Sequence, residues 1–220
     1  MILTAQIVRY ADGQLLLAPD VSIDSILDQK HIGSVELRLN DGRNISNDQR
    51  RKIFAIIRDI SLWSGHEPEE LRQLMTWDFC YKKDFDWFSL RDVDMTTARE
   101  FLTYLIEFCF MWGVPTRDSL LNQTDDIGRY LYLCLAHRKC AICNAHAEVH
   151  HVNRIGMGRD REKVVHIGLK AIALCHEHHG QAHLGEKKLF EENYIYGIKL
   201  DAHLCERLRL NTKNRKDGRR

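Results

Sequence analysis

Histidine and cysteine residues are concentrated between Cys140 and His183, at spacings typical of metal sites. Ten of the twelve histidines lie between Cys134 and Cys205. Imidazole and thiolate are the ligands with which proteins hold zinc and related metals. The pattern predicts two sites with different roles, one closed and structural and one open to chemistry.

The first predicted site combines two pairs of residues with the same spacing. Cys140 and Cys143 form a C-x-x-C turn, and Cys175 and His178 repeat that spacing. Three thiolates and one imidazole close a tetrahedral site without room for substrate, so we expect a structural Zn2+ that fastens two distant segments. An alternative is that His176 supplies the imidazole. The other cysteines lie in apolar or helical contexts and are predicted to be buried thiols: Cys80, Cys109, Cys134 and Cys205.

The second predicted site uses the histidines that remain. His179 and His183 are four residues apart, so on a helix they share one face and can bind one ion together. His150 and His151 are neighbours in an apolar stretch, and in a strand their side chains point to opposite sides. One of the two can therefore bind the metal while the other contacts a different partner, such as a water.

These residues resemble the HNH endonuclease family over about 45 positions, from the first C-x-x-C pair to the final H-x-x-x-H. The resemblance implies a core of two strands and a helix around one divalent metal. It assigns His150, His179 and His183 as ligands of a catalytic ion (Mg2+, Mn2+, Ni2+ or Zn2+) and His151 as the general base. It also implies hydrolysis of DNA to products with a 5′ phosphate and a 3′ hydroxyl.

Two positions depart from the family pattern. In the family, the second pair of structural ligands lies in the sequence C-x-x-C-H, whereas this chain has His178 in place of the second cysteine of that pair. The middle asparagine of the family is also replaced, because its position is occupied by Lys170 and the nearest polar substitute is His166. The orientation of the base therefore depends on a residue that the family pattern does not identify.

Basic residues follow the tandem histidines and are predicted to contact DNA. The segment 153–163 contains two glycines, which allow close backbone approach, and its charge suits a phosphate backbone. An ordinary solvated loop is the other interpretation, since Asp160 and Glu162 offset part of the charge. The predicted DNA-binding residues are Arg154, Arg159, Arg161, Lys163 and Lys170.

Charge is unevenly distributed although the formal net charge is only +1. Residues 1–129 carry 15 Lys and Arg against 21 Asp and Glu, whereas residues 130–220 carry 17 against 10. The basic half contains the metal motif, as a nucleic-acid enzyme requires. The chain shows no signal peptide and no membrane-spanning run, so we expect a cytoplasmic protein (host cytoplasm if phage-encoded) with reduced thiols.

Upstream of the motif, the pattern predicts several elements. Asp12-Gly13 indicates a turn between two short strands. Ser46 and Gln49 form a capping box, which predicts a helix start. The expected strands are 2–9, 13–18 and 35–39. Four helices are expected: one begins at Ser46, one begins at Glu67-Pro68, and two span 97–112 and 125–137.

The first half resembles the phage NinB/Orf recombination-mediator family, which binds DNA and single-strand-binding protein. The residues that carry this resemblance are Ser46-x-x-Gln49-Arg50-Arg51-Lys52, Asp59-Ile60, Ser89-Leu90 and Thr96-Thr97-Ala98. The resemblance implies DNA, single-strand-binding protein and a second copy of the chain (a homodimer) as partners. No membrane partner is expected.

Together these observations predict an α+β fold. We expect a mixed α/β module with several helices over 1–128, a zinc-stabilised ββα-metal domain over 129–205, and a basic tail over 206–220. The predicted function is a metal-dependent DNA endonuclease in phage recombination or replication. The alternative is a non-catalytic DNA-binding recombination mediator whose zinc domain serves only for folding and DNA contact.

Overall fold

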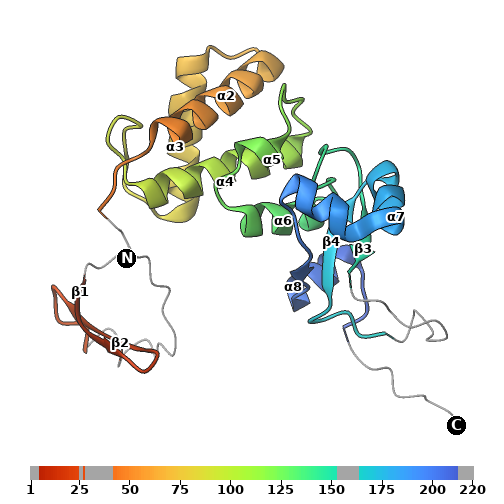
Figure 1. Ribbon diagram of the computed structural model, residues 1–220. Coiled ribbons are helices and arrows are strands. Elements are labelled where there is room, and N and C mark those ends of the chain that lie inside the picture. Colours follow the sequence, from red (N-terminus) through yellow and green to blue (C-terminus); the bar gives the residue numbers. More distant parts are fainter. Residues whose placement is uncertain (1–4, 25–26, 28–41, 153–163, 213–220) are drawn as a thin grey trace, which may run out of the picture.

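The computed structural model describes residues 5–24, 27, 42–152 and 164–212 (Figure 1). The first element is an antiparallel hairpin of β1 (Ala5–Ala11) and β2 (Gln14–Pro19). Asp12 and Gly13 connect the strands with φ values of 52° and 76°, which suits a tight turn between twisted strands. The hairpin confirms the predicted strand pair, whereas the strand expected at 35–39 lies outside the described residues.

Three long helices follow, namely α2 (Asn47–Ser64), α3 (Pro68–Lys83) and α4 (Met95–Trp112). The predicted capping box begins α2, because the Ser46 side chain accepts the Gln49 N–H and Gln49 Oε1 accepts the Ser46 N–H. Gln49 Nε2 also donates to the Met95 carbonyl, so this cap joins the starts of α2 and α4. The helix starts read from the sequence are therefore confirmed to within two residues.

Short elements form the second half of the chain. α5 (Leu120–Gln123) and α6 (Ile127–Ala136) precede a three-stranded antiparallel sheet in the order β3-β4-β5. Its strands are β3 (Glu148–His151), β4 (Lys170–Leu174) and β5 (Ile198–Lys199). α7 (His176–Asn193) packs on β3 and β4, and α8 (Ala202–Leu208) packs on α6.

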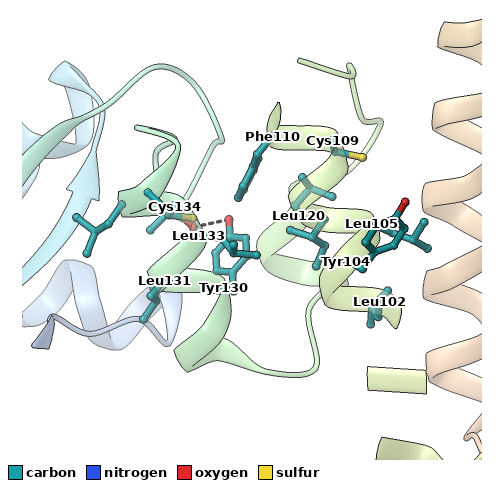
Figure 2. Close-up of a cluster of buried hydrophobic side chains, with 14 of the residues drawn as sticks. Leu102, Tyr104, Leu105, Cys109, Phe110, Leu120, Tyr130, Leu131, Leu133 and Cys134 are labelled. Atoms are coloured by element: carbon teal, nitrogen blue, oxygen red, sulfur yellow. Dashed lines mark hydrogen bonds between the residues drawn. The ribbon is translucent and has the colours of Figure 1, made fainter. Parts of the chain in front are cut away.

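One continuous cluster of buried side chains extends from α2 to α8. Figure 2 shows part of this cluster, with side chains of α4 on one side, those of α6 on the other, and Leu120 of α5 between them. The Phe110 and Tyr130 rings lie with their centroids 6.0 Å apart. α6 also packs on β4, so the helices and the sheet share this core.

The described residues thus form a mixed structure of seven helices and two small antiparallel sheets, as the α+β expectation requires. The boundaries near 128 and 205 stay predictions, although Leu208 is buried and Arg207 donates to the Ala136 carbonyl. Residues 213–220 of the predicted tail lie outside the described residues. Among the residues that are described, no helix combines the length and apolar character needed to cross a lipid bilayer.

We expect Ser46→Ala to lower the free energy of unfolding by about 1 kcal/mol, because the first turn of α2 loses a cap. Urea denaturation followed by circular dichroism measures this change. Ser64→Ala, in the last turn of the same helix, is the control and should shift stability by less than about 0.5 kcal/mol. Equal effects of the two substitutions would show that the capping box does not stabilise this fold.

Candidate functional site

A cluster of three thiols and one imidazole joins the turn after α6 to the start of α7. Cys143 Sγ lies 3.7 Å from Cys175 Sγ, and His178 Nδ1 lies 3.1 Å from Cys175 Sγ. His178 Nδ1 is also 3.5 Å from Cys140 Sγ and 3.7 Å from Cys143 Sγ. Ligands at about 2.1–2.3 Å around one tetrahedral ion lie roughly 3.6–3.8 Å apart. The four side chains therefore could hold one metal ion, and His178 rather than His176 is the imidazole that joins them.

The backbone holds this cluster in place. Cys140 N–H donates to the Ala145 carbonyl and Asn144 N–H donates to the Cys140 carbonyl, which closes the C-x-x-C turn. Ala141 N–H donates to the Ala173 carbonyl, so the turn is fixed to β4. The donor set, with three sulfurs and one nitrogen, is one that zinc prefers.

The thiols of the cluster have different pKa values. Burial opposes ionisation of Cys175, but the backbone N–H groups of His178 and Glu177 and the nearby thiols lower its pKa below the usual range. Burial, with the adjacent Cys140 and Cys175 thiols, raises the pKa of Cys143 to about 12. A metal must therefore displace protons from this site, and Cys175 ionises more readily than Cys143.

The four remaining cysteines are buried, which confirms their prediction as buried thiols. Burial raises the pKa of Cys109 to about 12, so that thiol stays protonated at neutral pH. Thiols in this state are poor nucleophiles and poor metal ligands. The four are Cys80, Cys109, Cys134 and Cys205.

A second cluster brings together His150 of β3 with His179 and His183 of α7. The ring centroids are 4.8 Å apart for His150 and His179, 5.5 Å for His150 and His183, and 4.8 Å for His179 and His183. His150 is buried, whereas His183 is exposed to solvent. The structure therefore brings together the three predicted histidines, and they could hold one metal ion on the open side of α7.

Electrostatics favour the neutral form of His179 that a metal requires. Burial lowers the pKa of His179, and the neighbouring His150 and His183 rings lower it further, while Glu148 acts in the opposite direction. Glu148 Oε2 lies 3.5 Å from His179 Nδ1. A neutral imidazole offers a lone pair to an ion without first releasing a proton.

Glu186 is a site residue that the sequence reasoning missed. Its Oε2 lies 2.8 Å from His150 Nε2, and because a carboxylate only accepts, this nitrogen must carry the proton. The other ring nitrogen of His150 then keeps the lone pair for an ion, as in carboxylate–histidine–metal sites. Glu186 follows His183 by three residues, which is a helical spacing that could have indicated it. Gly185, however, has non-helical angles (φ −170°, ψ 69°) and kinks α7 at this point.

His151 faces a different partner from that of His150. Its Nε2 lies 2.9 Å from His166 Nδ1, and the two ring centroids are 4.9 Å apart. His150 pairs with Ile172 and His151 with Ala171 in the antiparallel register, so the neighbours project to opposite faces of β3. The expected separation of the tandem histidines is therefore observed, and His166 is a polar residue in contact with His151.

The predicted DNA-binding residues divide into two groups. Lys170 begins β4, is exposed, and lies opposite Lys199 of β5 in the sheet register. Its carbonyl accepts the Val152 N–H, which places it beside the end of β3 that carries His151. The rest of the group lies outside the described residues: Arg154, Arg159, Arg161 and Lys163.

We expect one tightly bound metal ion per chain after gel filtration, measured by elemental analysis, and its loss in Cys143→Ala. That variant should lose more than about 4 kcal/mol of unfolding free energy, as when a structural metal is removed. His183→Ala is the matched contrast and should keep both the tight ion and the stability. Retention of the ion in Cys143→Ala would contradict the ligand set.

We expect Glu186→Ala to weaken Mn2+ binding at the three-histidine cluster by about 10- to 100-fold, because His150 loses the carboxylate that orients it. Calorimetric titration of the protein with Mn2+ measures this affinity. Glu191→Ala, which removes an exposed carboxylate from the same helix, should leave the affinity unchanged. Equal affinities in the two variants would exclude a role for Glu186.

The comparison with curated proteins gave no match, and neither did the comparison with solved structures. A family model described as "Putative HNHc nuclease" matches residues 19–211. The match covers most of the chain, including the helices α2 to α4 as well as both clusters. The chain therefore belongs to this HNH nuclease family.

Proposed function

We propose that the protein is a metal-dependent endonuclease that hydrolyses phosphodiester bonds in DNA. The observation that carries the proposal is the cluster of His150, His179 and His183 with His151 directly beside it on β3. Family membership supports a nuclease, and the cluster provides the groups that such a reaction needs. Nucleases of this family generally use a divalent metal.

We infer that β3, β4 and α7 act together as a ββα-metal unit. The edge strand β3 carries His150 and His151, and α7 supplies the other two histidines. The Cys140, Cys143, Cys175 and His178 cluster would hold a structural Zn2+ that fastens α7 to the turn before the sheet. The two ions then have separate roles. The cysteine-containing cluster fills all four positions around a tetrahedral ion, whereas the three histidines leave a position open for water or substrate.

In the proposed reaction His151 is the general base. A histidine can take a proton from water near neutral pH as that water attacks phosphorus. A divalent ion on the three histidines (Mg2+, Mn2+, Ni2+ or Zn2+) would neutralise phosphate charge and stabilise the departing 3′ oxygen. Glu186 keeps His150 in one orientation throughout, because the carboxylate holds its Nε2 proton.

DNA contacts are proposed for the edge of the sheet beside His151. Lys170 is exposed at the start of β4, and Lys199 lies opposite to it, so positive charge is available there for a phosphate backbone. The basic residues of the segment 153–163 are proposed to extend this contact: Arg154, Arg159, Arg161 and Lys163.

A role in phage recombination or replication, with single-strand-binding protein or a second copy of the chain as partners, rests on the residues of the helical half that resemble NinB/Orf proteins. The alternative function is a non-catalytic mediator with a structural zinc domain. A cleavage assay separates the two functions, because only the nuclease turns over.

We expect the purified protein to cleave supercoiled, single-stranded or branched DNA when Mg2+, Mn2+ or Ni2+ is supplied. His151→Ala should reduce the cleavage rate by about 10²- to 10⁴-fold, which is the usual contribution of a general base. Gel electrophoresis of the products measures both rates and reports the 5′ phosphate and 3′ hydroxyl ends.

The control for this experiment is the metal content of His151→Ala, which should match that of the wild type because no proposed ligand changes. If both proteins cut equally, His151 is not the base. If neither cuts but both bind DNA, the nuclease proposal fails and the mediator becomes the better account.

A further inference from the structure

Lys170 and Lys199 lie directly opposite each other on two neighbouring strands. They are partners in the β4–β5 register, and both are exposed to solvent. Opposite side chains of an antiparallel pair have Cβ atoms about 4.5–5.5 Å apart, and like charges at such positions are destabilising. The sheet therefore holds two ammonium groups together although their mutual repulsion opposes this arrangement.

The backbone around the lysine pair keeps the two strands together. Leu200 N–H donates to the Leu169 carbonyl at 2.9 Å, and the Leu200 carbonyl accepts the Gly168 N–H at 2.8 Å. Gly197 lies so close to the end of β3 that a Cβ at this position would come within 2.5 Å of Val152 Cγ2. Because these contacts fix β5 beside β4, the strands do not relieve the repulsion by separating.

The lysine pair lies on the same face of the sheet as the three-histidine cluster. His150 is opposite Ile172 in the β3–β4 register, and Lys170 precedes Ile172 by two residues on β4. Alternate residues of a strand share a face, so both lysines project to the side on which His150 meets the histidines of α7. Two residues of a strand span about 7 Å, so the pair lies about that far along the sheet from the row that contains His150.

We propose that Lys170 and Lys199 together bind one phosphate of the DNA strand, next to the phosphate that is cleaved. This inference rests on the proposed function, because it names the part of the substrate that the face binds beside the cluster. A phosphate between the two ammonium groups contacts both and relieves their repulsion. The substrate is then a polynucleotide, with a further phosphate beside the bond that is hydrolysed.

A pair of like charges predicts opposite effects of one substitution on folding and on binding. Lys199→Gln removes the repulsion, so we expect the thermal midpoint of unfolding to rise by roughly 1–3 °C. The same variant loses a contact to phosphate, so DNA binding should weaken to a similar extent for all sequences. A lysine that only keeps the surface soluble would not affect DNA affinity.

The shared phosphate is tested by fluorescence anisotropy of the full chain with a labelled DNA duplex, at several salt concentrations and without added divalent ion. We expect Lys170→Gln/Lys199→Gln to reduce the slope of log affinity against log salt by about 1, as for one phosphate. The double variant should bind little more weakly than either single variant, because both lysines contact the same group. A reduction of about 2 with additive losses would show separate phosphates and contradict the inference.

The matched control is Lys82→Gln/Lys83→Gln, which neutralises two exposed lysines in the last turn of α3. It should leave the salt slope as in the wild type. An equal reduction in the control would show that overall charge, rather than the pair on the sheet, determines the slope.

Cleavage by the metal-loaded protein supplies a second test. We expect Lys199→Gln to raise KM for plasmid DNA by about 10-fold, with a smaller effect on kcat. The loss in kcat/KM should be larger for DNA than for bis(p-nitrophenyl) phosphate, because that small substrate has a single phosphate. Equal losses on the two substrates would overturn the inference.

The inference and the nuclease proposal can fail separately. If the wild type cuts DNA but the salt slope is the same in every variant, the phosphate subsite is wrong and the nuclease stands. If the wild type cuts neither substrate with any metal but the double variant has the reduced slope, the lysine pair stands as a DNA contact and the nuclease proposal fails.

Discussion

The candidate site depends on the junction between the Cys140–Cys143 turn and the first turn of α7. Four side chains meet there at distances that suit a single tetrahedral ion, and His179 follows the last of them directly in the sequence. A fixed first turn determines where the next turn of the helix points, so His179 and His183 face β3 only while this junction is intact. The predicted structural ion and the predicted catalytic histidines are therefore coupled through a single helix rather than through a shared ligand.

The junction is in turn attached to the helical half of the molecule. Tyr130 of α6 donates its hydroxyl to the Ala141 carbonyl and accepts Asn144 Nδ2, at 3.0 Å and 2.6 Å. Asn144 Oδ1 accepts the Leu120 N–H at the start of α5. Asn144 has a positive φ of 59°, a conformation that asparagine adopts more easily than most residues. One side chain thus closes the C-x-x-C turn and connects it to two helices.

Local chemistry made part of this structure predictable. Ligand spacing identified both clusters, and the capping box at Ser46 gave the start of α2, because each depends on residues close together in the sequence. Glu186 was missed because the kink at Gly185 changes which way the end of α7 points. The sequence left open whether Lys170 or His166 replaces the family's asparagine. The contact of His166 with His151 could not be predicted, because it depends on how a turn fifteen residues away packs on Asn211 and Leu200. α8 was not predicted either, because its short apolar pattern is stabilised mainly by packing on α6.

The tandem histidines show how one strand can serve two chemical purposes. Consecutive residues of β3 project to opposite faces, so His150 contacts Glu186 and the α7 histidines while His151 contacts His166. Beside His150 Nε2 the Glu186 carboxylate is an acceptor and determines which ring nitrogen keeps the lone pair, whereas the group beside His151 Nε2 is a second imidazole. The Glu186 carboxylate carries a full negative charge, which suits an imidazole that donates its lone pair to a cation. The His166 imidazole has no permanent charge, so the two faces of β3 offer their histidines partners of different chemistry.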